Sequence, residues 1–248
     1  MVGILSDIGN YRSVNEDSVG HFKNDNFAIY IVADGMGGHN AGEIASKLAV
    51  DSIIDSLKKL DSIEDGGKLL ESSIEHANSL IYKHSREKSN LSGMGTTITA
   101  CLVYGDEMVI GNVGDSRCYI INKENNIIKI TKDHSLVQQL LDDGSITEEE
   151  AVVHPNKNII TRALGTNPSI LVDIFVINLK DIRKVLLCTD GLTNDVTPNQ
   201  IYDIIMKNNC CDASKLLVEL SKEKGGRDNI SVIVFEGECK DDRYFTGK

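Results

Sequence analysis

One stretch, residues 27–46 with the sequence FAIYIVADGMGGHNAGEIAS, constrains the fold more than any other part of the chain. It begins with an apolar, β-branched run over 29–33, which is typical of a buried strand. A single carboxylate, Asp34, follows, and then come glycines that let the backbone turn sharply and approach a ligand closely. Helical spacing starts at Ala41. The stretch therefore predicts a strand that ends in an acid, a loop of bare backbone and the start of a helix.

This layout suits a small charged ligand, and the sequence limits which one. No Gly-Lys-Ser/Thr follows the glycines, so the loop is not a nucleotide P-loop. A carboxylate at the centre indicates a cation rather than a bare phosphate. The net charge of −11 argues against a general nucleic-acid binder, and it suits a protein that gathers carboxylates around cations.

The chain as a whole has ordinary globular composition, with 248 residues, 41% hydrophobic and 25% charged. Only three prolines and no Ser/Gly-rich linker occur, so we predict one domain over 1–240 and a polar tail over 241–248. No apolar run approaches the ~20 residues of a membrane span, and no signal peptide is recognisable, so we expect a cytoplasmic protein without membrane contact. The six cysteines lack Cys-x-x-Cys spacing, which predicts reduced, buried thiols.

Hydrophobic periodicity predicts strands, two helices, more strands, two helices and a last strand. Short turns between strands indicate antiparallel pairing. Each helix pair needs a sheet to cover, so we predict an α+β fold: a four-layer α-β-β-α sandwich of two antiparallel β-sheets packed face to face and flanked by antiparallel helix pairs. We also predict a flap-like surface excursion over 143–160 that contacts substrate. The predicted strands are 2–8, 17–22, 29–33, 96–104, 107–113, 117–121, 127–130, 171–179, 184–188 and 229–235, and the predicted helices are 41–60, 64–88, 135–142, 198–207 and 212–224.

Four aspartates recur in one setting, beside or near a glycine at the edge of an apolar strand. They are Asp34, Asp115, Asp190 and Asp228. Carboxylates that gather raise one another's pKa, and a divalent cation removes that cost. Oxygen ligands without clustered His or Cys fit Mg²⁺ or Mn²⁺ better than Zn²⁺. On spacing alone, the alternative that each Asp-Gly is simply a turn stays open.

Eight short motifs occur in a fixed order along nearly the whole chain. They are RSVNED (12–17), VADGMGGHNAGEIAS (32–46), GMGTTITACLV (93–103), GNVGDSRCYI (111–120), TKDHS (131–135), ITRALG (160–165), LLCTDGLTN (186–194) and GGRDNISVIV (225–234). Any one of them is weak, but together they are specific. The chain resembles the metal-dependent protein serine/threonine phosphatases of the type-2C class, in their compact bacterial form.

The resemblance implies hydrolysis of phosphoserine and phosphothreonine in proteins, with two to three Mn²⁺ or Mg²⁺ ions as cofactors. A hydroxide that bridges a dinuclear centre attacks phosphorus directly in this family. Asp34 would bridge two of the metal ions, with the Gly35 carbonyl on one of them. Asp190 and Asp228 would complete the carboxylates of the first metal, and Asp17 would hold metal-bound waters.

Three further residues are implied by the resemblance. Asp115 would hold a third, weaker metal together with Asp190, Arg12 would bind the substrate phosphate with its planar fork, and His39 is the nearest match to the general acid. The spacing around His39 differs from the family pattern. The alternatives are that Arg12 is a solvated turn residue, that His39 is a loop residue and that Asp115 caps a turn beside Arg117. For His134 in TKDHS we expect a structural role, hydrogen bonding to a turn.

Three functions compete. The first is a phosphatase of phosphorylated proteins, acting as a monomer and opposing a bacterial Ser/Thr kinase. The second is a catalytically silent relative that binds phosphoproteins, and the intact carboxylates argue against it. The third is a two-metal phosphodiesterase or nuclease, and the acidic net charge argues against that.

Overall fold

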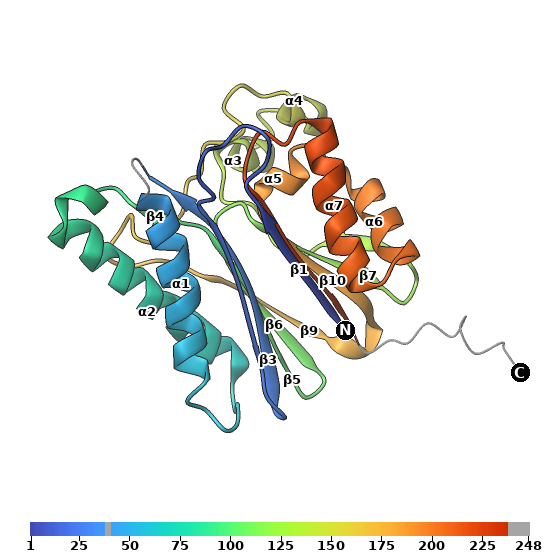
Figure 1. The fold of residues 1–248 in the computed structure, drawn as a ribbon, viewed down its shortest axis with the longest axis horizontal. Helices are drawn as coiled ribbons and strands as arrows, with labels where there is room; N and C mark the ends of the chain where they lie inside the picture. The colour runs from blue at the N-terminus through green and yellow to red at the C-terminus, as the bar shows by residue number, and fades with distance from the viewer. Residues whose placement is uncertain (38–40, 238–248) are drawn as a thin grey trace, which may run out of the picture.

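The protein forms four layers, with a pair of helices on each outer side and two β-sheets between them (Figure 1). The computed structural model describes residues 1–37 and 41–237. The predicted α+β sandwich is confirmed, and the bounds of the five predicted helices differ from the observed ones by a few residues at most, while the short α5 was not predicted. The helices are α1 Ala41–Leu57, α2 Gly66–Glu87, α3 Leu136–Asp142, α4 Glu148–Val152, α5 Asp190–Thr193, α6 Pro198–Lys207 and α7 Cys210–Lys224, with short 3-10 turns at η1 Ser89–Leu91 and η2 Leu179–Asp181.

Both sheets are antiparallel throughout, as predicted. The first has the strand order β1-β11-β10-β7-β8, and the second has the order β2-β3-β5-β6-β9 with the short β4 beside β3. The strands of the first sheet are β1 Val2–Asp7, β7 Arg117–Asn122, β8 Ile127–Lys129, β10 Ile182–Cys188 and β11 Ile230–Glu236. Those of the second are β2 Asp17–Lys23, β3 Phe27–Met36, β4 Gly95–Thr96, β5 Ile98–Tyr104, β6 Glu107–Val113 and β9 Asp173–Asn178.

Three apolar layers hold the sandwich together. In the central layer, Val32 and Met108 of the second sheet pack against Val185 and Ile233 of the first. The outer layers lie between the second sheet and α1–α2, and between the first sheet and α5–α7. Because β3 is covered on both faces, its run over 29–33 is apolar at every position instead of alternating. Each fully buried aliphatic side chain of this kind stabilises the fold by about 1.5–3 kcal/mol.

Strand β3 continues further than its sequence predicts. The prediction ends the strand at the acid, but β3 runs through Asp34 to Met36. The reason is β4, whose two residues pair with this extension, Gly35 opposite Thr96 and Met36 opposite Gly95. Asp34 therefore lies inside a paired strand, which holds its backbone firmly.

The chain changes sheets between β6 and β7. Short turns predict that consecutive strands pair, and this expectation is wrong here, because β6 belongs to the second sheet and β7 to the first. Three residues make the crossing, beginning with Gly114, whose φ of +111° suits a residue without Cβ. Asp115, the next residue, is thereby carried to the gap between the ends of the two sheets.

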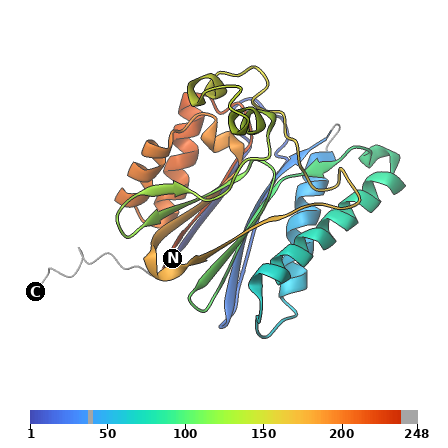
Figure 2. The ribbon, with the colours of Figure 1, turned by 180° about the vertical axis from the view of Figure 1, so that it is seen from behind.

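Residues 135–160 leave the sandwich between β8 and β9, and we call them the flap. They contain α3 and α4, and their base is closed by a bridge between Ser135 and Ile160. The predicted excursion over 143–160 falls inside the flap. Figure 2 shows both short helices at the same end of the molecule as α5. No helix in the described ranges is long and apolar enough to cross a membrane.

Candidate metal centre and phosphate site

Five of the predicted carboxylates meet at one end of the sandwich. Asp17 on β2 lies directly opposite Asp34 on β3 in the antiparallel register. Asp190 begins α5 immediately after β10, Asp228 lies just before β11, and Asp115 lies at the crossing between the sheets. The negative charges of the other four all act on Asp34. Acids from distant parts of the sequence thus share one site.

Three oxygen atoms in this cluster have no hydrogen-bond partner. They are Oδ1 of Asp17, Oδ1 of Asp115 and Oδ1 of Asp190, all buried. Buried polar atoms are almost always hydrogen-bonded, so three such oxygens in one cluster call for a partner that is not a protein atom. Hard divalent cations and their bound waters prefer oxygen ligands of this type. The residues present therefore fit Mg²⁺ or Mn²⁺.

Burial, reinforced by mutual repulsion, raises the pKa values of these carboxyls. The pKa of Asp17 is raised to about 7 and that of Asp115 to about 8, chiefly by burial, with the Asp190 charge adding to both. The pKa values of Asp34 and Asp190 are raised for the same reasons. Crowded carboxyls of this kind keep protons at a pH where ordinary aspartates are ionised, unless a cation offsets their charge.

The peptide group of Asp34 is fixed by two threonines, Thr96 at the end of β4 and Thr97 between β4 and β5. The Asp34 N–H donates to Thr97 Oγ1 at 2.9 Å. The Asp34 carbonyl accepts from Thr96 Oγ1 at 2.8 Å and from the Thr97 N–H at 2.9 Å. Both threonines are fully buried. The GTT segment therefore positions the central carboxylate as well as packing in the core.

Two residues on the opposite side of the cluster, Thr189 and Asn229, connect neighbouring segments of the site. Both lie within the sequence motifs, but we predicted no role for them. Thr189 donates through Oγ1 to Asp17 Oδ2 at 2.8 Å, which links β10 to β2. Asn229 accepts from the Glu16 N–H at 2.8 Å, which ties the segment before β2 to the start of β11. Each is a polar residue beside a site aspartate at the end of an apolar strand, and that position is the signal in the sequence that could have identified them.

Arg12 lies at the exposed edge of the cluster. Its Nη2 donates to Asp228 Oδ2 at 2.9 Å, and its side chain is 49% exposed. This hydrogen bond raises the pKa of Arg12, although partial burial opposes the increase. A guanidinium has five N–H donors, and the bond to Asp228 uses one of them. The others are the type of donor that binds phosphoryl oxygens in pairs.

The sequence predicts a general acid at His39 and a structural role for His134, and the structure describes only the second of these residues. His39 lies outside the described residues, so its role as a general acid stays a prediction. His134 accepts the Gly114 N–H through Nδ1 at 3.0 Å, and its Nε2 lies 3.2 Å from Asp173 Oδ2. It therefore hydrogen-bonds to the turn that carries Asp115, in line with the structural role expected for it.

Arg117, two residues after Asp115, forms no ion pair with it. Its guanidinium pairs instead with Asp133, with 3.0 Å from Nε to Oδ2 and 2.6 Å from Nη2 to Oδ2. This leaves the orphan oxygen of Asp115 without a protein partner.

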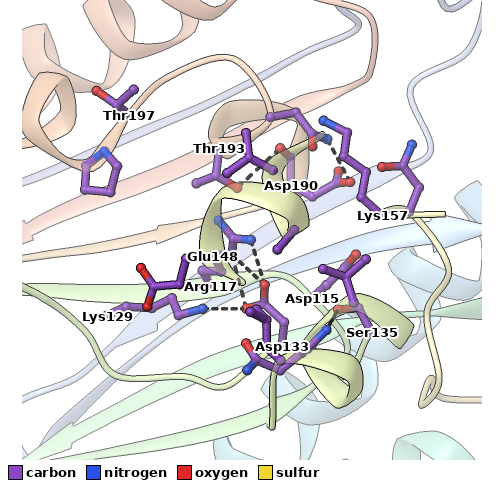
Figure 3. Close-up of a pocket in the computed structure, with 18 of the residues that line it drawn as sticks. Asp115, Arg117, Lys129, Asp133, Ser135, Glu148, Lys157, Asp190, Thr193 and Thr197 are labelled. Atoms are coloured by element: carbon purple, nitrogen blue, oxygen red, sulfur yellow. Dashed lines mark hydrogen bonds and ion pairs between the residues drawn. The ribbon is translucent and has the colours of Figure 1, made fainter. Parts of the chain in front are cut away.

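The carboxylates do not by themselves enclose a metal ion. Within 1–37 and 41–237, no three His, Cys, Asp or Glu side chains form a ready-made metal cage. Mg²⁺ is ordinarily held by one or two carboxylates and several waters, so an open carboxylate set is compatible with it and differs from a tetrahedral zinc site. A cavity of about 950 Å³ adjoins the cluster, with Asp115 and Asp190 in its wall (Figure 3).

Comparison with known proteins gives one consistent result. A family model described as protein phosphatase 2C matches residues 11–215. The serine/threonine phosphatase Stp of Listeria welshimeri is 40% identical over 236 residues, which cover 93% of each chain. The crystal structure of the serine/threonine phosphatase Stp1 from Staphylococcus aureus matches with a TM-score of 0.90 and 38% identity, over 95% of each chain.

A third relative bears on the metal. The catalytic domain of the phosphatase PstP, solved in complex with two manganese ions, matches with a TM-score of 0.82 and 34% identity, over 94% of this chain and 96% of that one. The family model and these relatives each span most of the chain, so the chain belongs to the protein phosphatase 2C family.

Proposed function

We propose that this protein hydrolyses phosphoserine and phosphothreonine in phosphorylated proteins at a centre of two to three Mn²⁺ or Mg²⁺ ions. The observation that carries the proposal is the set of three buried carboxylate oxygens without partners, on Asp17, Asp115 and Asp190. Oxygens of this kind are costly in a folded protein unless a cation or its waters occupy the space between them.

The carboxylates have distinct places in this proposal. Asp34, with the Gly35 carbonyl, would be shared by two ions, and Asp190 and Asp228 would complete the ligands of one of them. Asp17 would hold waters bound to the ions. Asp115 would hold a third, weaker ion together with Asp190. When bound, such ions supply an acidified water as nucleophile near neutral pH and offset charge on the phosphoryl oxygens.

The remaining steps belong to the protein's own side chains. Arg12 would hold the phosphoryl group through the N–H donors that Asp228 leaves free, which orients phosphorus and stabilises its oxygens. His39 would donate a proton to the serine or threonine oxygen as it leaves. We propose no covalent intermediate, and the described cysteines are free thiols, four of them buried in the fold.

The test uses two substrates with the full chain. We expect hydrolysis of p-nitrophenyl phosphate and of a phosphothreonine peptide with Mn²⁺, and loss of both activities with EDTA. Asp34→Asn, purified in the same way, excludes a contaminating phosphatase. Absence of metal-dependent turnover would favour a silent phosphoprotein-binding relative, while hydrolysis of phosphodiesters alone would favour a nuclease.

The setting follows from the substrate class. We propose that the protein acts as a monomer in the cytoplasm, opposing a Ser/Thr kinase, with residues 1–240 as one catalytic domain. Free, buried cysteines suit a reducing compartment. The tail over 241–248 lies outside the described residues.

A further inference from the structure

The cavity beside the carboxylate cluster is larger than one phosphorylated side chain requires. Its volume of about 950 Å³ lies at the upper end of the ~300–1,000 Å³ that ligand pockets have. Part of its lining belongs to the flap and includes Val152, and another part belongs to α5 and the segment before α6 and includes Asp195. Because Asp115 and Asp190 also line it, the cavity continues outward from the proposed metal centre.

Several charges in the cavity wall are already neutralised. Arg117 and Lys129 both contact Asp133, at 2.6 and 3.3 Å. Asp142 pairs with Lys132 at 2.7 Å. These groups hold one another in place, and the two carboxylates offset two of the three positive charges.

Three other charged groups in the wall have no such partner. In the part of the chain that the structure describes, Glu148, Asp195 and Lys157 form no ion pair, although Asp195 Oδ2 accepts the Gly226 N–H at 3.1 Å. Figure 3 shows Lys157 on the side of Asp190, and Glu148 further along toward Lys129. Lys157 therefore lies near the proposed metal centre, and Glu148 lies away from it.

We propose that this cavity binds the polypeptide that flanks the phosphorylated residue, and that Glu148 and Asp195 select substrates carrying a Lys or Arg side chain beside the phosphosite. This inference rests on the proposed function and names its substrate class. Both carboxylates line the cavity, one on α4 of the flap and one in the segment before α6, so each can pair with a cationic side chain that enters it. An acidic side chain there meets two negative charges without a neutralising partner.

The apolar part of the wall supports the same occupant. Val152 lines the cavity and is 71% exposed. The long aliphatic stem of Lys or Arg covers such a surface while its charged end reaches a carboxylate. Lys157 is left to face the phosphoryl group, which carries the opposite charge.

The first experiment is a lysine scan of substrate peptides. A phosphothreonine peptide with alanine on both sides is compared with peptides carrying one lysine, or one glutamate, at each position from four before to four after the phosphothreonine. We expect at least one position where lysine raises kcat/KM over glutamate by about three- to tenfold, the size of two partly exposed charge pairs. At ~1 M NaCl, where the Debye length is ~3 Å, the difference should disappear.

The second experiment assigns the preference to the cavity. Glu148→Lys should shift the lysine-to-glutamate ratio of kcat/KM toward glutamate at the same position. The matched control is Glu149→Lys, which makes the same charge change in the same turn of α4 but at a residue that does not line the cavity. The control should keep the wild-type ratio and the wild-type rate on p-nitrophenyl phosphate. Circular dichroism checks that both variants are folded.

The outcomes separate the inference from the proposed function. Equal kcat/KM for all peptides, or equal shifts in Glu148→Lys and Glu149→Lys, would overturn the inference while hydrolysis of p-nitrophenyl phosphate upholds the proposed function. Failure of the wild-type protein with Mn²⁺ on every substrate would overturn the proposed function, and the inference with it.

Discussion

The carboxylates around Asp34 are held in a way that costs folding stability. Hydrogen bonds with Thr96 and Thr97 fix the backbone of Asp34, so the Asp34 side chain has little freedom to turn away from the neighbouring carboxylates. Burial raises its pKa, and the charge of Asp17 across the strand pair adds to that shift. Without a bound cation, the carboxylates repel one another and lower the stability of the folded protein. Loss of stability at a functional site is a common cost of activity.

Asp34→Asn should therefore make the metal-free protein more stable and the enzyme inactive. The amide has nearly the same shape but no charge, so we expect the free energy of unfolding in EDTA to rise by about 1 kcal/mol or more, about 2–4 °C in Tm. We also expect Mn²⁺ to lose its stabilising effect on Tm and kcat to fall by about 100-fold or more. Differential scanning calorimetry with and without Mn²⁺ measures the changes in Tm, and hydrolysis of p-nitrophenyl phosphate measures kcat. Asp51→Asn, an exposed carboxylate on α1, is the control. A lower Tm in EDTA for Asp34→Asn would contradict the argument.

Arg12 offers a second prediction that concerns geometry rather than charge. Arg12→Lys keeps a cation that can pair with Asp228, but it loses the planar fork that binds two phosphoryl oxygens. We expect kcat/KM on p-nitrophenyl phosphate to fall by about 10- to 100-fold and the inhibition constant of inorganic phosphate to rise. Arg86→Lys, at an exposed position on α2, should change neither value. An unchanged inhibition constant in Arg12→Lys would mean that the guanidinium does not hold phosphate.

At the scale of elements, the junction between β3 and α1 decides where Asp34 lies. A Cβ on Gly35 would stand 2.2 Å from the Gly42 carbonyl oxygen and 2.4 Å from that of Glu16. Both are backbone atoms, which cannot move aside as a side chain does. The close approach of strand, helix start and the segment before β2 therefore depends on a glycine at this position.

Gly35→Ala should separate these elements. We expect a loss of about 3 kcal/mol in the free energy of unfolding, at the upper end of the cost of overpacking, and a lower affinity for Mn²⁺ in whatever remains folded. Urea denaturation and isothermal titration calorimetry measure the two effects. Gly67→Ala in the first turn of α2 is the matched control, because its Cβ meets nothing closer than 3.5 Å and alanine favours a helix. Equal stability of the two variants would show that the junction tolerates a side chain.

Most elements could be predicted from the sequence because their signals are local. The buried residues of α2 recur every three or four positions, and the buried run of β3 is continuous. Each pattern reflects burial of a short segment. The extension of β3 past Asp34 could not be predicted, since it depends on β4, about sixty residues later. The change of sheet between β6 and β7 was missed for a similar reason. Pairing between segments is decided by packing of the whole sandwich, which no single window of sequence contains.

At the scale of the whole molecule, the candidate site was only partly visible in the sequence. The aspartates stand out because each is an acid beside an apolar strand. Thr189 and Asn229 lie beside two of these aspartates, but the sequence does not show that each connects the two sheets at the site. For His134 the sequence predicts a hydrogen bond to a turn, but it does not show that the ring joins the crossing between the sheets to β9. These connections couple distant elements, so their effect appears in the stability of the entire fold.

The His134 connection predicts a dependence of stability on pH. Burial lowers the pKa of His134, and this outweighs the opposing effect of Asp173. Below the ordinary histidine pKa of ~6.5, the unfolded chain therefore takes up a proton that the folded chain resists. The resulting contribution to stability is present above that pH and is lost as the pH falls through the lower, folded pKa. Protonation of Nδ1 would also replace the acceptor of the Gly114 N–H with a second donor.

His134→Gln tests this, because glutamine does not titrate. The free energy of unfolding in urea is measured at intervals from pH 7.5 to pH 5 with EDTA, and the difference between wild type and variant is plotted. We expect the wild type to lose stability relative to the variant on going below pH ~6.5, by about 1.4 kcal/mol for each unit by which the pKa is depressed. The pKa of Asp173 is also lowered, by Arg162 and His134 against the effect of burial, but that carboxylate acts below pH ~4, outside this window. Parallel curves for the two proteins between pH 7.5 and 5 would show that His134 titrates alike in the folded and unfolded chain, and the ring would then hold the Asp115 turn by shape alone.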